Sequence, residues 1–268
     1  MKTNSSWQKV APWYNKVTKG GEGHYYHQHV VIPNVLRLLE LNNKLQMSNV
    51  KLLDMACGNG VLGRALPKNI DYLGIDIAPS LISEAKRNDR NFSHKYIVGD
   101  VTEPISVSSD FTHAAIILAL QNIKNPESAL QNVSKSLVSG GKFVIVLNHP
   151  AFRIPRQSSW GIDETKKTQY RRIDRYMSPL EIPIHIHPHT KNFSVRVYPS
   201  DRTSQVAMSY HFPISDYSKM LKDVGFVIEA IEEWTSDKES VGRAGKMENR
   251  ARNEIPLFMT IVAKKLDF

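Results

Sequence analysis

Short apolar runs alternate with amphipathic segments through the first half of the chain, between residues 51 and 148. The apolar runs have the length of buried strands, and the segments between them repeat their apolar positions near the 3.6-residue period of a helix. We therefore expect strands at 51–55, 70–76, 94–99, 112–118 and 142–148, and helices at 60–66, 79–88 and 126–137. This alternation predicts an α/β fold with a mostly parallel sheet, helices on both faces and right-handed crossovers.

The regions on either side of this pattern differ from it. Residues 7–23 are interrupted by glycines and predict an irregular entry segment, whereas 25–45 repeat apolar positions as a helix does. Residues 149–211 are rich in proline and predict an insertion, in which 182–187 forms an edge strand that 195–198 and 206–210 could pair with. A helix at 214–224 and two closing strands at 226–232 and 257–263 follow.

Length and composition limit the classes of protein to consider. The 268 residues suit one domain, for which we expect an N-terminal cap over 1–45 and a substrate lid over 149–211. The longest apolar run, 114–120, is too short to span a bilayer. The start of the chain lacks a hydrophobic secretory core, and one cysteine allows no intrachain disulfide, so a cytoplasmic location is expected. The net charge of +9 is dispersed, which fits a solvated surface or a contact with an anionic partner.

The segment Leu52–Gly60 (LLDMACGNG) carries the clearest chemical signal. It reads as a strand, an acid and a glycine-rich turn that leads into a helix, and such a turn lets the backbone approach a ligand closely. Gly58, Gly60 and Gly63 match G-x-G-x-x-G, with Asp76 18 residues after Gly58, as in dinucleotide sites. Asp54 favours another ligand, because a carboxylate there suits the cationic end of S-adenosylmethionine better than a pyrophosphate.

Three of the expected strands end in an acid, at Asp54, Asp76 and Asp100. Ligands of open α/β sheets bind at the carboxyl ends of the strands, where these side chains meet. Asp76 is placed to accept hydrogen bonds from ribose hydroxyls, and Asp100 from an exocyclic amine such as that of adenine. The three acids and the glycine turn together favour S-adenosylmethionine over a dinucleotide.

With these motifs, the chain resembles the class I S-adenosylmethionine-dependent methyltransferases, and most closely their small-molecule, type 11-like branch. The resemblance runs over about 51–147 and 211–265, and it implies a Rossmann-like seven-stranded sheet closed by an antiparallel hairpin. Ser139 replaces the usual proline of the family's "PGG" turn, and Thr112 the usual acid of the fourth strand. Gln121 and Asn122 replace the family's paired histidines, which leaves no histidine chemistry at those two positions.

The expected cofactor site comes from these motifs and from the end of the fourth strand. It comprises Asp54, Ala56, Cys57, Gly58, Asn59, Gly60, Asp76, Ile77, Asp100, Val101, Leu118 and Ala119. Cys57 is expected there as a small residue of the turn and not as a nucleophile. After methyl transfer, the cofactor S-adenosylmethionine would become S-adenosylhomocysteine.

Acceptor contacts are expected from three other places. His149, after the fifth strand, is the candidate general base; the alternative is a loop histidine bonded to backbone. Tyr26 and His27 could border the pocket from the N-terminal segment, with Tyr14 also able to reach the cofactor; the alternative is packing against the sheet. Trp160, Tyr170 and Arg172 belong to an insertion whose aromatic and arginine residues could bind a planar anionic substrate, or could be held by internal pairs of Asp174 with Arg171 or Arg175.

His185, His187 and His189 have the spacing that places side chains on one strand face, but Pro188 interrupts it and no cysteine or acid completes a ligand set. No metal is therefore expected.

The sequence predicts methyl transfer to a small-molecule acceptor by in-line displacement, which depends mainly on alignment of donor and acceptor. The alternatives are a nucleic-acid methyltransferase and a non-catalytic, cofactor-binding regulator. The sequence leaves the oligomeric state open.

Overall fold

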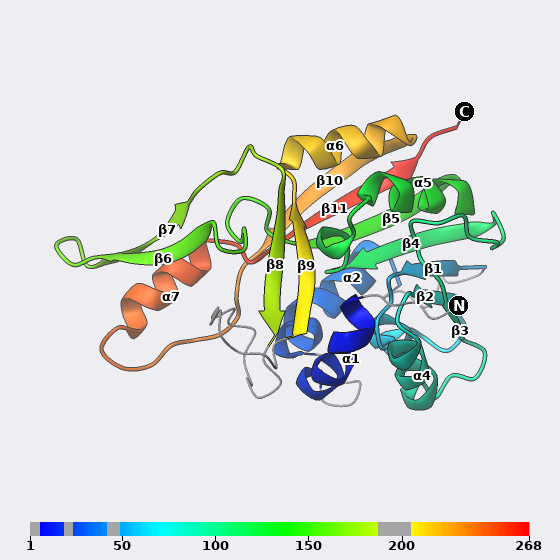
Figure 1. Ribbon diagram of the computed structural model, residues 1–268, viewed down its shortest axis with the longest axis horizontal. Coiled ribbons are helices and arrows are strands. Elements are labelled where there is room, and N and C mark those ends of the chain that lie inside the picture. The colour runs from blue at the N-terminus through cyan, green and yellow to red at the C-terminus, as the bar shows by residue number, and fades with distance from the viewer. Residues whose placement is uncertain (1–5, 19–23, 42–48, 187–204, 268) are drawn as a thin grey trace.

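A seven-stranded sheet forms the centre of the computed structural model, which describes residues 6–18, 24–41, 49–186 and 205–267 (Figure 1). Its strand order is β10-β11-β5-β4-β1-β2-β3, and only β11 runs antiparallel to its neighbours. The strands are β1 (Lys51–Met55), β2 (Asp71–Asp76), β3 (Lys95–Val98), β4 (Phe111–Ile117), β5 (Leu137–Asn148), β10 (Phe226–Trp234) and β11 (Phe258–Lys265). The mostly parallel, seven-stranded α/β sheet expected from the sequence is confirmed.

Helices cover both faces of this sheet, with α5 and α6 on one face and α2, α3 and α4 on the other. The helices of the described residues are α1 (Ser6–Val17), α2 (Ile32–Leu38), α3 (Val61–Ala65), α4 (Pro79–Asn88), α5 (Pro126–Ser136), α6 (Ile214–Asp223) and α7 (Gly245–Glu254), with a π-helical turn η2 (His27–Val31) and a 3-10 turn η4 (Leu120–Asn122). Two apolar cores result, one under α5 and α6 and one under α2, α3 and α4. None of these helices is long and apolar enough to cross a membrane.

The strand order places a reversal between β1 and β4. From β1 the chain steps outward to β2 and β3, and then returns to β4 on the other side of β1. The loops after β1 and β4 therefore leave the same sheet edge in opposite directions, and a crevice opens between them. This edge is where the three expected carboxylates lie.

The insertion after β5 forms two hairpins. Strands β6 (Ser158–Asp163) and β7 (Thr168–Ile173) pair antiparallel and project away from the sheet beside α7 (Figure 1). Strands β8 (Leu180–Ile186) and β9 (Gln205–His211) also pair antiparallel, as expected for 182–187 with 206–210. The expected pairing of 195–198 and the positions of His187 and His189 lie outside the described residues.

One expectation for the N-terminal region is wrong, and one helix near the C-terminal end was not predicted. Residues 6–17 form helix α1, although the glycines at 20, 21 and 23 indicated an irregular segment over 7–23. Pro12 lies inside this helix and is exposed, and the burial of Val10, Ala11 and Trp13 on the other faces offsets the backbone hydrogen bond that a proline cannot donate. The strongly polar stretch 245–254 forms α7, which the sequence analysis did not predict because it has almost no apolar repeat.

Helix α1 is tied to the turn after β1 and to α4. The side-chain amide of Asn59 donates to Asn15 Oδ1 (3.1 Å) and Thr18 Oγ1 (2.8 Å) at the end of α1. Gln8 Oε1 accepts from the backbone amide and hydroxyl of Ser80, at the start of α4. These bonds hold α1 over the carboxyl edge of the sheet.

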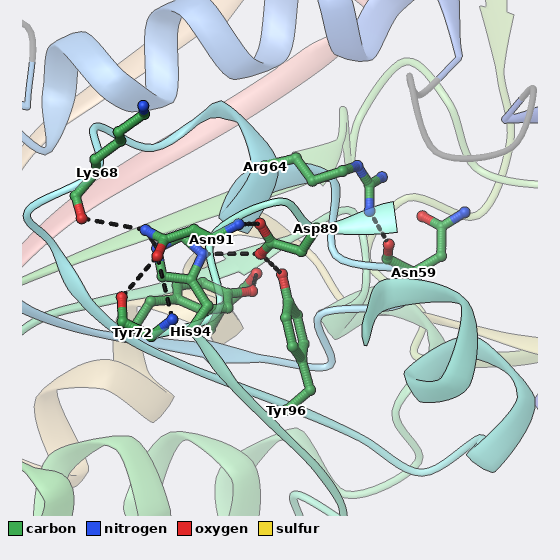
Figure 2. A network of polar contacts seen from close by, with 10 residues as sticks. Asn59, Arg64, Lys68, Tyr72, Asp89, Asn91, His94 and Tyr96 are labelled. Atoms are coloured by element: carbon green, nitrogen blue, oxygen red, sulfur yellow. Dashed lines mark hydrogen bonds and ion pairs between the residues drawn. The ribbon is translucent and has the colours of Figure 1, made fainter. Parts of the chain in front are cut away.

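Two tyrosines pack beneath the glycine-rich turn. Tyr72 and Tyr96 make an edge-to-face contact with ring centroids 5.4 Å apart, and both are buried. Tyr96 donates to Asp89 (2.6 Å), which also bonds His94 (2.8 Å) in the network shown in Figure 2. A Cβ on Gly63 would overlap the Tyr96 hydroxyl and lie 3.0 Å from the ring of Tyr72. The third glycine of the motif therefore serves packing between helix and strand.

The substitution Gly63→Ala tests this packing. It should lower the free energy of unfolding by about 1–3 kcal/mol, because the network around Asp89 prevents Tyr96 from moving away. Chemical denaturation of Gly63→Ala, Tyr96→Phe and the double variant measures the coupling. The double variant should lose less than the sum of the two single losses, since the overlapping hydroxyl is gone. Strict additivity would contradict the overlap.

Candidate functional site

A cavity of about 1300 Å³ lies at the reversal of strand order. Its wall contains residues from the ends of β1, β2 and β4, from α1 and from the insertion. Of the expected cofactor residues, the cavity is lined by Ala56, Gly58, Asp76, Ile77, Asp100, Val101, Leu118 and Ala119. Asp54, Cys57, Asn59 and Gly60 lie behind this surface. The structure therefore brings most of the expected cofactor residues to one cavity.

The side chain of Asp76 accepts hydrogen bonds from two loops, one after β1 and one after β2. Its Oδ2 accepts from the amide of Gly58 (2.9 Å) and its Oδ1 from the amide of Ala78 (2.9 Å). The side chain is buried, and desolvation raises its pKa to about 6, although both amides oppose the shift. Each carboxylate oxygen keeps a further lone-pair site for a hydroxyl donor from the cavity.

Asp54 is held under the glycine turn. Its Oδ2 accepts from the hydroxyl of Tyr72 (2.7 Å), and no bond to it from backbone amides is seen among the described residues. Burial raises its pKa to about 7, and the nearby Asp76 adds to the rise. Ionised Asp54 therefore supplies negative potential directly behind the cavity.

Two residues at the same place have a strained backbone conformation. Ala56 (φ +58°) and Leu118 (φ +52°) follow the neighbouring strands β1 and β4, and both line the cavity. A positive φ costs a residue with a side chain of order 1 kcal/mol and is found mostly at functional sites. Gly58 (φ +57°) meets the same requirement with no such cost, and a Cβ there would lie 3.7 Å from Tyr14.

The third expected acid, Asp100, keeps one oxygen available. Its Oδ1 accepts from the amide (2.9 Å) and hydroxyl (2.7 Å) of Thr102, while Oδ2 has no hydrogen bond among the described residues. Across the cavity, Gln121 donates to Leu118 O (2.9 Å), and its own buried Oε1 lacks a partner there. Both oxygens are free to accept hydrogen bonds from a ligand.

The expected acceptor residues divide into two groups. Tyr26, His27 and Trp160 line the cavity, whereas Tyr170 and Arg172 do not. Tyr170 packs across Gly161 on the adjacent strand and is half exposed. Arg172 pairs with Asp174 (3.0 Å), where the sequence analysis had paired Asp174 with Arg171 or Arg175. Neighbouring residues of a strand point to opposite faces, which explains why Arg171 reaches the cavity and Arg172 does not.

His149 does not line the cavity. It is 1% exposed, and its Nδ1 accepts from the amides of Ala151 (3.1 Å) and Phe152 (3.3 Å). Its Nε2 lies 2.5 Å from Glu233 Oε1, so the proton belongs on Nε2, which donates to that carboxylate. Burial lowers its pKa. Both ring nitrogens are engaged, which fits the alternative of a histidine bonded to backbone.

Several cavity residues were not assigned a site role from the sequence. Trp7 comes from the unpredicted helix α1, Arg153 from the turn that opens the insertion after β5, and Phe258 from β11. Only the hydrogen-bonded geometry of the turn after β5 brings Arg153 into the wall.

Cys57 is bonded only weakly, with Sγ 3.7 Å from Gly58 O, and burial raises the pKa of its thiol, which disfavours a nucleophilic thiolate. Among the described residues, no three His, Cys, Asp or Glu side chains are placed to hold a metal.

Comparison with known proteins supports the same assignment. Residues 53–145 match the sequence model of the methyltransferase domain family. The ubiquinone biosynthesis O-methyltransferase of Coxiella burnetii is 25% identical over 112 residues, which are 41% of this chain and 48% of that protein. The chain thus aligns with about half the length of this relative. Residues 53–145 therefore have the sequence pattern of a methyltransferase domain.

Solved structures share the fold of this chain. An S-adenosylmethionine-dependent methyltransferase from Mesorhizobium loti is 22% identical, with a TM-score of 0.63 over 85% of this chain and 96% of that one. The glycopeptide N-methyltransferase MtfA, solved with S-adenosylmethionine, is 15% identical, with a TM-score of 0.52 over 86% and 93% of the two chains. The fold is therefore shared beyond the segment matched by the family model.

The cavity fits the chemistry of S-adenosylmethionine. Asp76 and Asp100 offer acceptors for ribose hydroxyls and an amine, and Asp54 supplies negative potential for a cationic methionine end. The absence of a Cβ at Gly58 leaves room where the turn faces the cavity. Each of these features is present in the chain's own residues before any ligand is bound.

The substitution Asp54→Asn should stabilise the ligand-free protein. Because the folded pKa of about 7 exceeds the ordinary 3.8, stability contributed by protonated Asp54 is lost as the pH rises from about 4 to 7. Above pH 7 the variant should gain about 1–3 kcal/mol in free energy of unfolding over the parent protein, and near pH 4 the gain should vanish. Urea denaturation at several pH values measures it. Asp71→Asn, at the exposed start of β2, should change stability by less than about 0.5 kcal/mol.

Proposed function

We propose that this chain transfers a methyl group from S-adenosylmethionine to a small-molecule acceptor by in-line displacement. The observation that carries the proposal is one cavity of about 1300 Å³ that includes the acidic strand ends and a separate aromatic region. Pockets for single ligands commonly measure about 300–1000 Å³, so this cavity has room for donor and acceptor together. The methyltransferase-domain match over 53–145 supports the donor half.

The donor half consists of residues from β1, β2 and β4. In the proposed complex, Asp76 accepts from the ribose hydroxyls, Asp100 from the adenine amine, and Ala56 and Gly58 provide backbone contacts. Ionised Asp54 lies behind the methionine end. The bound cofactor would supply an electrophilic methyl group on a sulfonium, and the residues' task is to hold it in line with the acceptor.

The acceptor half contains Tyr26, His27 and Trp160, with Phe258 beside them. His27 Nδ1 accepts from the amide of His24 (3.1 Å), and burial lowers the pKa of His27 to about 4. It therefore stays neutral at pH 7 and is suited to hydrogen bonding more than to strong base catalysis. Together with the occupied ring of His149, this favours catalysis by alignment and exclusion of water over a histidine base.

The enclosing hairpin β8–β9 supports a small acceptor over a nucleic acid. Ala207 of β9 packs on Val10 and Trp13 of α1, and so covers the cavity next to the sheet edge. A nucleic-acid methyltransferase would need an open, basic approach to the cofactor, and a non-catalytic regulator would not need an acceptor region. The curated relative is named an O-methyltransferase and MtfA an N-methyltransferase. We therefore propose methyl transfer without assigning which atom of the acceptor is methylated.

Calorimetric titration with S-adenosylhomocysteine tests the donor site, with NAD as the control. We expect binding of S-adenosylhomocysteine with Kd about micromolar and no binding of NAD. Binding of NAD in its place would reject the proposal in favour of the dinucleotide reading of Gly58, Gly60 and Gly63. If neither ligand bound to folded protein, the methyltransferase assignment itself would be wrong.

The affinity for S-adenosylhomocysteine should depend on pH through Asp76. Ribose hydroxyls bind its ionised form, and its pKa in the ligand-free protein is about 6, so affinity should fall as the pH decreases below about 6. Asp76→Asn should bind about 10–100-fold more weakly at pH 8, a loss typical of a hydrogen bond to a charged group. The variant's pH dependence between 5 and 7 should also be shallower than the parent's. An unchanged affinity would show that Asp76 does not contact the ribose.

A further inference from the structure

The charged residues of the cavity are separated by sign. Among the described residues that line it, the acids are Asp76 and Asp100, and both lie at the donor end. The bases are Lys124, Arg153, Arg156 and Arg171. Lys124 is already paired with Glu181 (3.5 Å), and Arg156 is exposed. Arg153 and Arg171 are both partly buried.

Arg153 is held in place by the turn that follows β5. The amide of Arg153 donates to the carbonyl of His149 (2.8 Å), while His149 Nδ1 accepts from Ala151 and Phe152. The amide of His149 in turn donates to Leu257 O (2.9 Å), next to β11. This turn is thus fixed to the sheet at one end and carries Arg153 at the other.

Arg171 is fastened to the same turn. Its Nε donates to Phe152 O (2.7 Å), its Nη2 donates to Ser158 Oγ (2.7 Å), and its guanidinium lies 5.2 Å from the ring centroid of Trp160. These neutral partners orient the side chain and leave its positive charge uncompensated. Burial and the neighbouring Arg153 both lower the pKa of Arg171.

Among the described residues, no acidic group neutralises Arg153. Among the described residues, its guanidinium has no ion pair or hydrogen bond, and burial lowers its pKa. A partly buried, unpaired cation is destabilising unless a counter-charge is supplied. Two such cations on one wall, beside an aromatic ring, form a site whose missing component is an anion.

We propose that the methyl acceptor carries an anionic group, a carboxylate or a phosphate, that Arg153 and Arg171 bind beside Trp160. The inference rests on the proposed function, since it assigns the chemistry of the acceptor in that same cavity. Arginine suits this task because its planar fork can bind two oxygens of either anion. The acceptor's methylated atom would point from this wall toward the acidic donor end, so that opposite charges fix the orientation of acceptor and donor.

Calorimetry on the full chain saturated with S-adenosylhomocysteine tests the proposal. The probes are 4-hydroxybenzoate, phenyl phosphate and neutral 4-hydroxybenzamide. We expect at least one anionic probe to bind about tenfold or more tightly than the amide, as for charge-assisted hydrogen bonds. The order of benzoate and phosphate identifies which anion the site prefers. Equal or tighter binding of the amide would overturn the proposal.

The variant Arg153→Gln should weaken binding of the preferred anion about tenfold and leave binding of the amide unchanged. Arg153→Lys should retain more of the affinity because it keeps the charge. The matched control is Arg172→Gln, on the opposite face of β7, which should bind the anion as the parent does. Unchanged anion affinity in Arg153→Gln would exclude the assigned role.

Two further measurements separate causes of failure. Thermal unfolding of Arg153→Gln should match or exceed that of the parent, because the variant removes an unpaired cation; a large loss of stability would assign Arg153 a structural role and contradict the proposal. Binding of S-adenosylhomocysteine is measured first on each protein. If it binds and the anions show no preference, the anion site alone is wrong, whereas failure of S-adenosylhomocysteine to bind rejects the proposed function.

Discussion

The hydrogen bond from Tyr72 to Asp54 fixes the part of the molecule on which the rest of the site depends. The Tyr72 ring packs on Tyr96 under the turn after β1, and its hydroxyl donates to the Asp54 carboxylate at 2.7 Å. This contact links β1 with β2, their register pairing Asp54 with Gly74, and leaves space above the rings for only a glycine at position 63. The shape of the glycine turn thus follows from two tyrosines on neighbouring strands.

The same contact brings a cost that the cofactor can offset. Asp54 and Asp76 are both buried, and each has a raised pKa because burial disfavours its charged form. Ala56 and Leu118 add strained backbone at the adjacent strand ends. Charge and strain of this kind persist only where the surrounding packing enforces them. Both carboxylates and both of these strained residues lie at the carboxyl edge of the sheet, and a ligand with hydroxyl and cationic groups would offset the cost of burying the two charges.

The sequence predicted the elements whose apolar period is regular and whose ligand groups follow a strand directly. Asp76 and Asp100 lie where a parallel sheet must place them, since strand ends converge whatever the loops do. Helix α1 was missed because the glycines that follow it suggested an irregular segment, and α7 because it has little apolar repeat to detect. Local composition does not encode such packing partners, which come from distant segments.

His149 shows why residue type alone could not assign the acceptor site. A histidine at a strand end suggested a base, but the turn that begins there uses its Nδ1 to accept two amides, and Glu233 from β10 occupies its Nε2. Those bonds shape the turn that carries Arg153 into the cavity. His149 therefore acts through the shape of the turn, because its hydrogen bonds determine where Arg153 lies, four residues later. On β7, alternation places Arg171 at the cavity and Arg172 in a pair with Asp174, a distinction that depends on strand register. The wall that carries Arg153 and Arg171 is therefore set by the hydrogen bonding of the insertion, whereas the acidic end of the cavity is set by the ends of the sheet strands.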